Sequence, residues 1–134
     1  MKYLLDTNIC IYLIKQQPAA VLQRFSQHEV GEIGISSITV AELFFGVEKS
    51  QQATQNRQAL AQFLLPLILV PFEAQAALAY GKVRAALEAQ GQPIGPLDTL
   101  IGAHALSLDV TLVTNNTREF NRIAGLSVEN WVTV

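Results

Sequence analysis

The sequence is poor in cysteine and in charged residues. It contains one cysteine, Cys10, among 134 residues, so an internal disulfide is excluded, which suits a reducing compartment. Charged residues make up 15% of the chain, against roughly 25% in an average soluble domain, and half of the residues are apolar. A chain of this composition either buries its apolar side chains in a large core or presents some of them to a partner.

Long apolar runs and an excess of positive charge are also lacking. The longest apolar stretch, residues 63–72, is broken by Pro66 and Pro71 and is much shorter than the roughly 20 residues of a membrane-spanning helix. Asp6 and Asn8 interrupt the N-terminus before the apolar region of a signal sequence can form. We therefore expect a cytoplasmic protein with no membrane segment. Because the formal net charge is −2, binding a polyanion would require a local basic rim or a bound cation.

The apolar pattern predicts one α/β domain that spans residues 1–134. Short apolar runs alternate with longer helical stretches, which indicates a central parallel sheet of four to five short strands flanked by helices. The expected strands are residues 3–5, 33–36, 67–70, 111–114 and 128–132. The expected helices are residues 9–15, 18–27, 38–47, a stretch ending near 65, 73–90, 98–108 and a short helix within 115–123. We expect residues 67–70 to be buried and the alanines of 73–90 to allow close helix packing.

Acidic and amide side chains recur at the places where strands end and helices begin. Asp6 and Asn116 lie just past the ends of two expected strands, and Asp98 begins a helix. Glu42 lies in the first turns of the helix that follows the second strand. Ligands of open α/β sheets bind beyond the carboxyl ends of the strands, so these residues can share one edge.

Two interpretations of these acids remain open. An aspartate at a helix start can simply cap the helix. Glu42 is the one charged residue in the segment 38–47, and a carboxylate in apolar surroundings is costly unless it is paired or bound to a metal. Carboxylate oxygens are ligands that Mg²⁺ and Mn²⁺ prefer. Zinc is disfavoured, because no cysteine or second histidine stands at ligand spacing from His104, which we expect to be structural or superficial.

Four blocks of the sequence resemble the signature blocks of PIN-domain ribonucleases, and most closely those of VapC toxins from bacterial type II toxin–antitoxin systems. The blocks stand in the family's order and cover nearly the whole chain. They are LLDTN at 4–8, SSITVAEL at 36–43, GPLDTLIGAHA at 95–105 and LVTNNTREF at 112–120.

The resemblance implies a PIN-like three-layer fold and an endoribonuclease that depends on Mg²⁺ or Mn²⁺. By motif position, Asp6, Glu42 and Asp98 would hold the metal, which would position a water for attack on a phosphodiester. Asn116 stands where the family commonly has an acid, which favours one ion with Asn116 as a water-mediated ligand. Glu119 is the alternative source of the missing charge.

The neighbours of these residues have two interpretations each. Thr7, Asn8 and Thr114 either orient Asp6 and reach the metal through their oxygens, or only cap helices.

The same holds for the nearby cations. Arg118 and Arg122 either contact RNA phosphates or lie on a solvated helix face. Lys82 and Arg84 are expected on the outer face of the long helix at 73–90.

The resemblance also implies partners. A VapB-like antitoxin would cover the apolar helices and block the acidic edge, and a toxin homodimer within a toxin–antitoxin hetero-oligomer is expected. The implied substrate is cellular RNA, in this family often tRNA, including the anticodon loop of initiator tRNA.

Two other classes of protein share some of these features. The non-enzymatic alternative is an α/β protein-interaction module whose acids only cap helices. A phosphoaspartate hydrolase would need an aspartate two residues after Asp6, where this chain has Asn8.

Overall fold

The computed structural model describes residues 1–132, which form five strands and seven helices. The strands are β1 (Tyr3–Leu5), β2 (Ile33–Ser36), β3 (Ile68–Val70), β4 (Thr111–Val113) and β5 (Val128–Glu129). The helices are α1 (Thr7–Lys15), α2 (Ala19–Ser26), α3 (Ser37–Glu48), α4 (Ala53–Leu64), α5 (Ala74–Ala89), α6 (Pro96–Leu108) and α7 (Thr117–Phe120). Every expected element is present, although β5 is shorter than predicted. The last two residues of the predicted domain, 133–134, lie outside the described residues.

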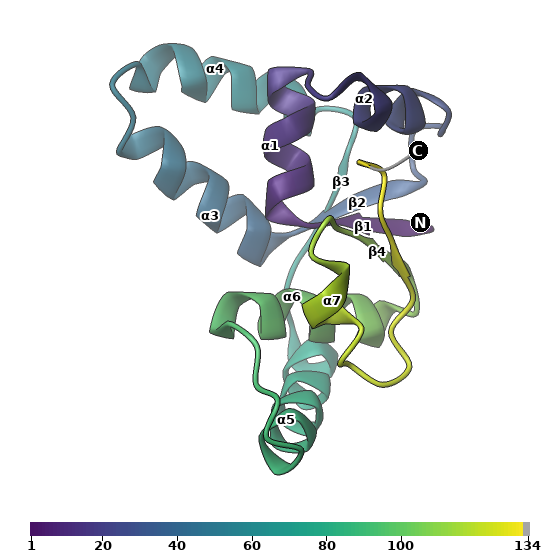
Figure 1. Cartoon of the computed structure of the whole chain (residues 1–134). Helices are drawn as coiled ribbons and strands as arrows, with labels where there is room; N and C mark the ends of the chain where they lie inside the picture. Colours follow the sequence, from purple (N-terminus) through teal and green to yellow (C-terminus); the bar gives the residue numbers. More distant parts are fainter. Residues whose placement is uncertain (133–134) are drawn as a thin grey trace.

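The five strands form one parallel sheet in the order β3-β2-β1-β4-β5, which confirms the predicted fold class. From β1 the chain moves outward to β2 and β3, and it then returns to place β4 on the other side of β1 (Figure 1). The direction of winding therefore changes between β1 and β4. Such a switch point opens a crevice at the carboxyl ends of its two strands, and ligands of α/β proteins bind there.

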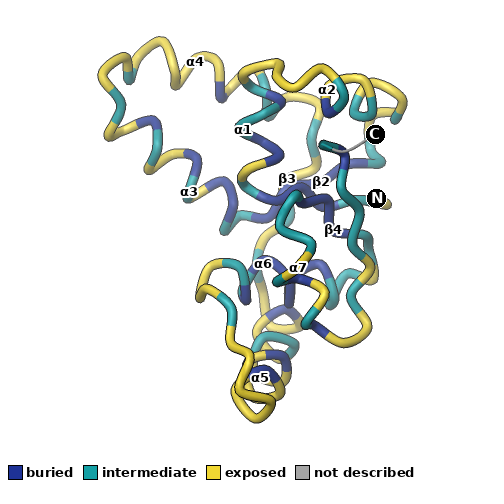
Figure 2. The backbone as a smooth tube through the Cα atoms, in the orientation of Figure 1, coloured by how far each residue is buried: buried dark blue, intermediate teal, exposed yellow. Residues whose placement is uncertain are grey.

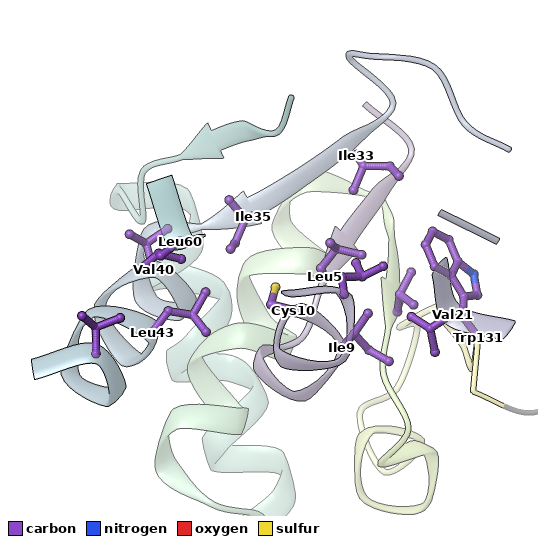
Figure 3. Close-up of a cluster of buried hydrophobic side chains, with 13 residues drawn as sticks. Leu5, Ile9, Cys10, Val21, Ile33, Ile35, Val40, Leu43, Leu60 and Trp131 are labelled. Carbon is purple, nitrogen blue, oxygen red and sulfur yellow. The ribbon is translucent and has the colours of Figure 1, made fainter. Parts of the chain in front are cut away.

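Helices cover both faces of the sheet and enclose two apolar cores. Successive side chains of a strand point to opposite faces, so Leu5 and Val113 pack on one side while Leu4 and Leu112 pack on the other. The first core joins the sheet to α1–α4 and includes Cys10 and Trp131, as Figure 3 shows. The second core lies between the sheet and α5–α7. The result is the three-layer arrangement that the sequence predicted.

One prediction about packing is wrong and another is confirmed in part. β3 was expected to be buried, but Ile68 and Leu69 are 40% and 52% exposed, because β3 is the edge strand and pairs with β2 alone. The alanines of α5 were expected to allow close helix packing, and α5 does pack closely along α6. It buries Ala76, Val83 and Leu87, while most of its other alanines are exposed, as Figure 2 shows for most of α5.

The aromatic residues and histidines divide between core and surface. His28 was expected to be superficial, but its ring stacks on Trp131 with the centroids 5.3 Å apart, and its side chain is 18% exposed. Phe44 and Phe45 of α3, expected in a core or an interface, are 44% and 65% exposed. No helix within residues 1–132 combines the length and the apolar character needed to cross a membrane.

Candidate active site

Asp6 lies at the switch point of the sheet with both of its carboxylate oxygens engaged. It follows β1 directly and caps α1, so its Oδ1 accepts a hydrogen bond of 2.7 Å from the Thr7 N–H. Its Oδ2 accepts a hydrogen bond of 2.7 Å from the hydroxyl of Thr114, which follows β4. Burial raises the pKa of Asp6, while these two hydrogen bonds lower it. The carboxylate is therefore held in one orientation by two strands that are distant in sequence.

Glu42 is connected to Asp6 through Thr7. The Thr7 hydroxyl donates a hydrogen bond of 2.8 Å to Glu42 Oε1, while the Thr7 N–H binds Asp6. The helix that carries Glu42, α3, begins at Ser36, whose hydroxyl accepts a hydrogen bond from the Ile38 N–H. Thr7 thus does more than begin α1, because it fixes one carboxylate relative to the other. Glu42 is partly exposed, so the open part of its carboxylate can meet a ligand.

Asp98 faces the other acids from the first turn of α6. Its pKa is raised from 3.8 to about 6, first by burial and then by the negative charges of Asp6, Glu119 and Glu42. Such effects fall off with distance, so four carboxylates from β1, α3, α6 and α7 share one region at the carboxyl edge of the sheet. A shared metal site formed by Asp6, Glu42 and Asp98 stays a prediction.

These carboxylates do not form a complete metal-ligand shell. Within residues 1–132, no three acidic, histidine or cysteine side chains lie close enough together to hold one metal ion. The chemistry of the donors nevertheless fits Mg²⁺ or Mn²⁺, which bind through one or two carboxylates and retain several waters. The repulsion that raises the pKa of Asp98 is also of the kind that a bound cation would relieve.

Asn116 and Glu119 border the acids from the segment after β4. The Asn116 N–H donates a hydrogen bond of 2.9 Å to the Thr114 hydroxyl, which itself donates to Asp6. Asn116 also precedes the short helix α7, where Glu119 lies near enough to raise the pKa of Asp98. Both interpretations of the fourth acidic position therefore remain available. Asn8, by contrast, is exposed on α1.

The two arginines of this segment differ in their surroundings. Arg118 is exposed at α7. Arg122 donates a hydrogen bond of 3.2 Å to the Pro93 carbonyl, so it ties the end of α7 to the turn that precedes α6 and Asp98. Arg122 therefore does not lie on a purely solvated helix face. No local pattern predicts this contact, which joins segments 29 residues apart.

His104 of α6 is structural, and the alternative of a superficial position is wrong. The side chain is buried, and its Nδ1 forms a hydrogen bond of 2.8 Å with the Ser36 hydroxyl. The ring also packs edge-on against Phe72, with the centroids 5.2 Å apart. Burial lowers the pKa of His104, and a hydrogen bond with the Pro71 carbonyl opposes that shift. His104 therefore links the helix of Asp98 to the cap of the helix of Glu42.

A groove with a volume of about 280 Å³ opens beside Glu42 between α1, α3 and α4. Thr7 and Glu42 line its polar end. The other lining residues are mostly apolar: Ile11, Ile14, Lys15, Leu43, Gly46, Val47, Asn56, Ala59 and Leu60. A second depression, along the same helix α1, extends past Tyr12 to Gln17 and Pro18. The two depressions therefore both lie along α1, and Glu42 lines the first of them.

Known proteins share this arrangement over the full length of the chain. The family model described as PIN domain matches residues 3–126. The chain therefore belongs to the PIN-domain family, and within it to the VapC group. It is 45% identical over 131 residues to the tRNA(fMet)-specific endonuclease VapC of Shigella flexneri, with 98% of each chain covered. It is 46% identical over 132 residues to the ribonuclease VapC2 of Haemophilus influenzae, with 98% of this chain and 99% of the relative covered.

Solved structures give the same result. The crystal structure of DNA-bound VapBC from Salmonella typhimurium matches with a TM-score of 0.93 and 41% identity, covering 98% of both chains. That of VapBC2 from Rickettsia felis, bound to a promoter DNA fragment, matches with a TM-score of 0.90 and 42% identity over 98% of this chain and 99% of the other.

Proposed function

We propose that this protein is a VapC-type toxin, a metal-dependent endoribonuclease that cleaves RNA phosphodiester bonds. The observation that carries the proposal is the pair of bonds by which Thr7 holds Asp6 and Glu42 beside each other at the switch point of the sheet, with Asp98 near enough for their charges to raise its pKa. The full-length similarity to proteins named ribonuclease VapC2 and tRNA(fMet)-specific endonuclease VapC supports the reaction class. The interaction-module alternative lacks comparable support, because helix capping alone does not explain why acids from four elements converge.

One or two of the acids Asp6, Glu42 and Asp98 would hold Mg²⁺ or Mn²⁺ directly and the rest through waters, since the three side chains do not lie close enough together to bind one ion jointly. A bound divalent cation would neutralise phosphate charge and activate a water. Within the chain, Thr114 and Thr7 keep the oxygens of Asp6 in place, and Thr7 does the same for Glu42. Asn116 would contact the ion through a water, and Glu119 adds negative charge beside Asp98.

The proposed substrate is tRNA, after the relative named as specific for tRNA(fMet). Because the acidic edge would repel RNA, the cations around it become important. Arg118 is exposed on α7 and would contact a phosphate. Arg122 already donates a hydrogen bond to the Pro93 carbonyl, so its main role is to hold the turn before Asp98 in place. Because tRNA is found in the cytoplasm, we place the protein there.

The proposed partner is a VapB-like antitoxin, as in the VapBC structures that this chain resembles. The groove along α1, α3 and α4 would take an apolar segment of the antitoxin, and its polar end at Glu42 suits a basic side chain. A toxin homodimer would cover other apolar surface. Exposed Phe45 of α3 and Leu69 of β3 are candidates for that contact.

The test is to sequence RNA ends after a brief pulse of expression. Wild-type protein is expected to produce new ends at a defined site in a small set of tRNAs. The variants Asp6→Asn and Asp98→Asn, which preserve side-chain volume, are expected to lower that cleavage at least about 100-fold. Cleavage by Asp98→Asn at nearly the wild-type rate would overturn the assignment and favour the interaction module.

A further inference from the structure

A second hollow lies on the other side of Asp98, between α5 and the turn that leads into α6. Its volume is about 260 Å³, slightly below the range of about 300–1,000 Å³ for sites that hold whole drug-sized ligands. One wall is formed by Tyr80, Arg84 and Glu88, which are spaced four residues apart on α5. The opposite wall is formed by Pro93, Ile94 and Pro96, with Leu87 and Thr99 completing the lining. The hollow is thus sized for a single small group.

The polar side chains of this hollow are held in place by one another. The Arg84 Nη1 donates a hydrogen bond of 3.0 Å to the Tyr80 hydroxyl, and its Nε donates one of 2.8 Å to Glu88 Oε2. The Arg84 side chain remains 60% exposed, so its guanidinium stands at the rim. Aromatic rings and guanidinium planes are the groups on which proteins stack unpaired RNA bases.

The position of the hollow connects it to the acids. Pro96 and Thr99, which line it, flank Asp98 in the first turn of α6. The Thr99 hydroxyl donates a hydrogen bond of 2.8 Å to the Gly95 carbonyl, and this bond fixes the turn that borders the hollow. Arg122 reaches the Pro93 carbonyl from α7 and brings a second guanidinium to the rim.

Charge favours a polyanion here more than at the acids. Arg84 lines the hollow and Arg122 reaches the Pro93 carbonyl beside it, while Glu88, which pairs with Arg84, is the one acidic residue of the lining. Proteins bind nucleic acids largely through contacts between the phosphates and cationic side chains. The rim of this hollow supplies them next to Asp98.

From this arrangement we infer that the hollow binds one unpaired nucleotide of the RNA substrate beside the scissile phosphate. The base enters between Tyr80 and the proline-rich turn, and Arg84 and Arg122 meet its phosphate. The inference rests on the proposed function and adds a subsite to it. A variant in which the hollow is blocked would retain the acidic site but bind its substrate with lower affinity.

The test compares Arg84→Ala with Lys82→Ala. Both changes remove one positive charge from the exposed part of α5, but Lys82 does not line the hollow. Arg84→Ala is expected to raise the KM for tRNA cleavage about five- to tenfold with kcat changed less than about twofold, the loss expected for one base and phosphate contact. Lys82→Ala is expected to change KM less than about twofold. Glu88→Gln releases Arg84 from its ion pair and is expected to lower KM.

A binding measurement separates this inference from the proposed function. Fluorescence anisotropy of a short unpaired RNA, without divalent cation, is expected to show weaker binding by Arg84→Ala than by Lys82→Ala. If the wild type cleaves RNA but the two variants behave alike in both assays, the subsite is wrong and the nuclease stands. If the wild type neither cleaves nor binds RNA, both are overturned. A change of oligomeric state in Arg84→Ala, seen by size-exclusion chromatography, would instead make the hollow a protein interface and also overturn the subsite.

Discussion

At the scale of single residues, Asp98 is a partly buried acid whose charge is repelled by neighbouring acids. Its pKa of about 6 reflects burial and the charges of Asp6, Glu119 and Glu42. An acid with a raised pKa in the folded state binds more protons there than in the unfolded chain between about pH 4 and 6. Its ionisation therefore destabilises the metal-free fold as the pH rises through that window.

Replacing Asp98 with Asn should stabilise the metal-free protein at pH 7 while abolishing its activity. The expected gain is on the order of 1–2 kcal/mol, after allowance for solvent screening, because Asn carries no charge to be repelled. The gain should shrink as the pH falls toward 4, where Asp98 is protonated. Urea unfolding of both proteins in EDTA at pH 4.5 and 7 measures it. A variant less stable than wild type at pH 7 would contradict the convergence of the acids.

His104 should give the opposite dependence on pH. Because its pKa is lowered in the fold, the unfolded chain binds more protons below about pH 6.5, and stability is lost as the pH falls through that value. His104→Gln removes this titration, so the stability difference between variant and wild type should become smaller at pH 5.5 than at pH 8. Denaturant titrations at the two pH values test this. An equal difference at both would mean that His104 keeps its ordinary pKa in the fold.

The sequence predicted that Thr7 and Thr114 can orient Asp6, which is confirmed, but it did not predict the contacts between helices that support the other acids. Asp6, Glu42 and Asp98 could be found because each stands near the end of a strand or the start of a helix, a relation that is local in the chain. The bond from Thr7 to Glu42 and that from His104 to Ser36 join helices whose relative rotation no local pattern records. Arg84 was expected on an outer face, and nothing in the sequence indicated that a proline-rich turn would lie against it.

At the scale of elements, the contact between α6 and α7 sets the position of Glu119 beside Asp98. Gly102 of α6 permits this contact, since a Cβ there would lie 2.5 Å from Ile123 Cδ1 and 3.3 Å from Phe120 Cδ1. Gly81 of α5 offers a contrast, because a Cβ there would meet no atom within 4 Å. The two glycines occupy helix interiors and differ in what surrounds them.

Gly102→Ala and Gly81→Ala should therefore change stability in opposite directions. Alanine improves helix propensity by roughly 0.5–1 kcal/mol at either site, so Gly81→Ala should stabilise the protein by about that amount. At Gly102 the crowding of Ile123 should outweigh this gain and destabilise the fold by about 1–3 kcal/mol. Thermal unfolding of the two variants measures both effects. Stabilisation by Gly102→Ala would show that α7 moves aside freely.

The order of the strands explains the wrong prediction for β3. Apolar residues at 67–70 look the same whether a strand lies at the centre or at the edge of a sheet. Which strands become neighbours depends on the path of the whole chain, and here β3 forms the edge beside β2. The exposed Ile68 and Leu69 therefore follow from topology rather than from composition.

At the scale of the whole molecule, the acids should make stability depend on divalent cations. A ligand that binds only the folded state stabilises it by about 2.7 kcal/mol at 100 times its Kd. Mn²⁺ should thus raise the Tm of the wild type but not that of Asp6→Asn. Asp109→Asn is the matched control, since it changes the chain's third aspartate, which is exposed at the end of α6. A Tm that rises equally in all three proteins would place the ion elsewhere.

β4 is synthesised long after β1, and this order determines when the site can form during translation. Asp6 leaves the ribosome more than a hundred residues before Thr114, which holds its second oxygen. Domains generally fold as units during translation. A nascent chain that stops before β4 carries an untethered Asp6 and an incomplete central sheet. The site around Asp6 is therefore not assembled until synthesis has passed β4.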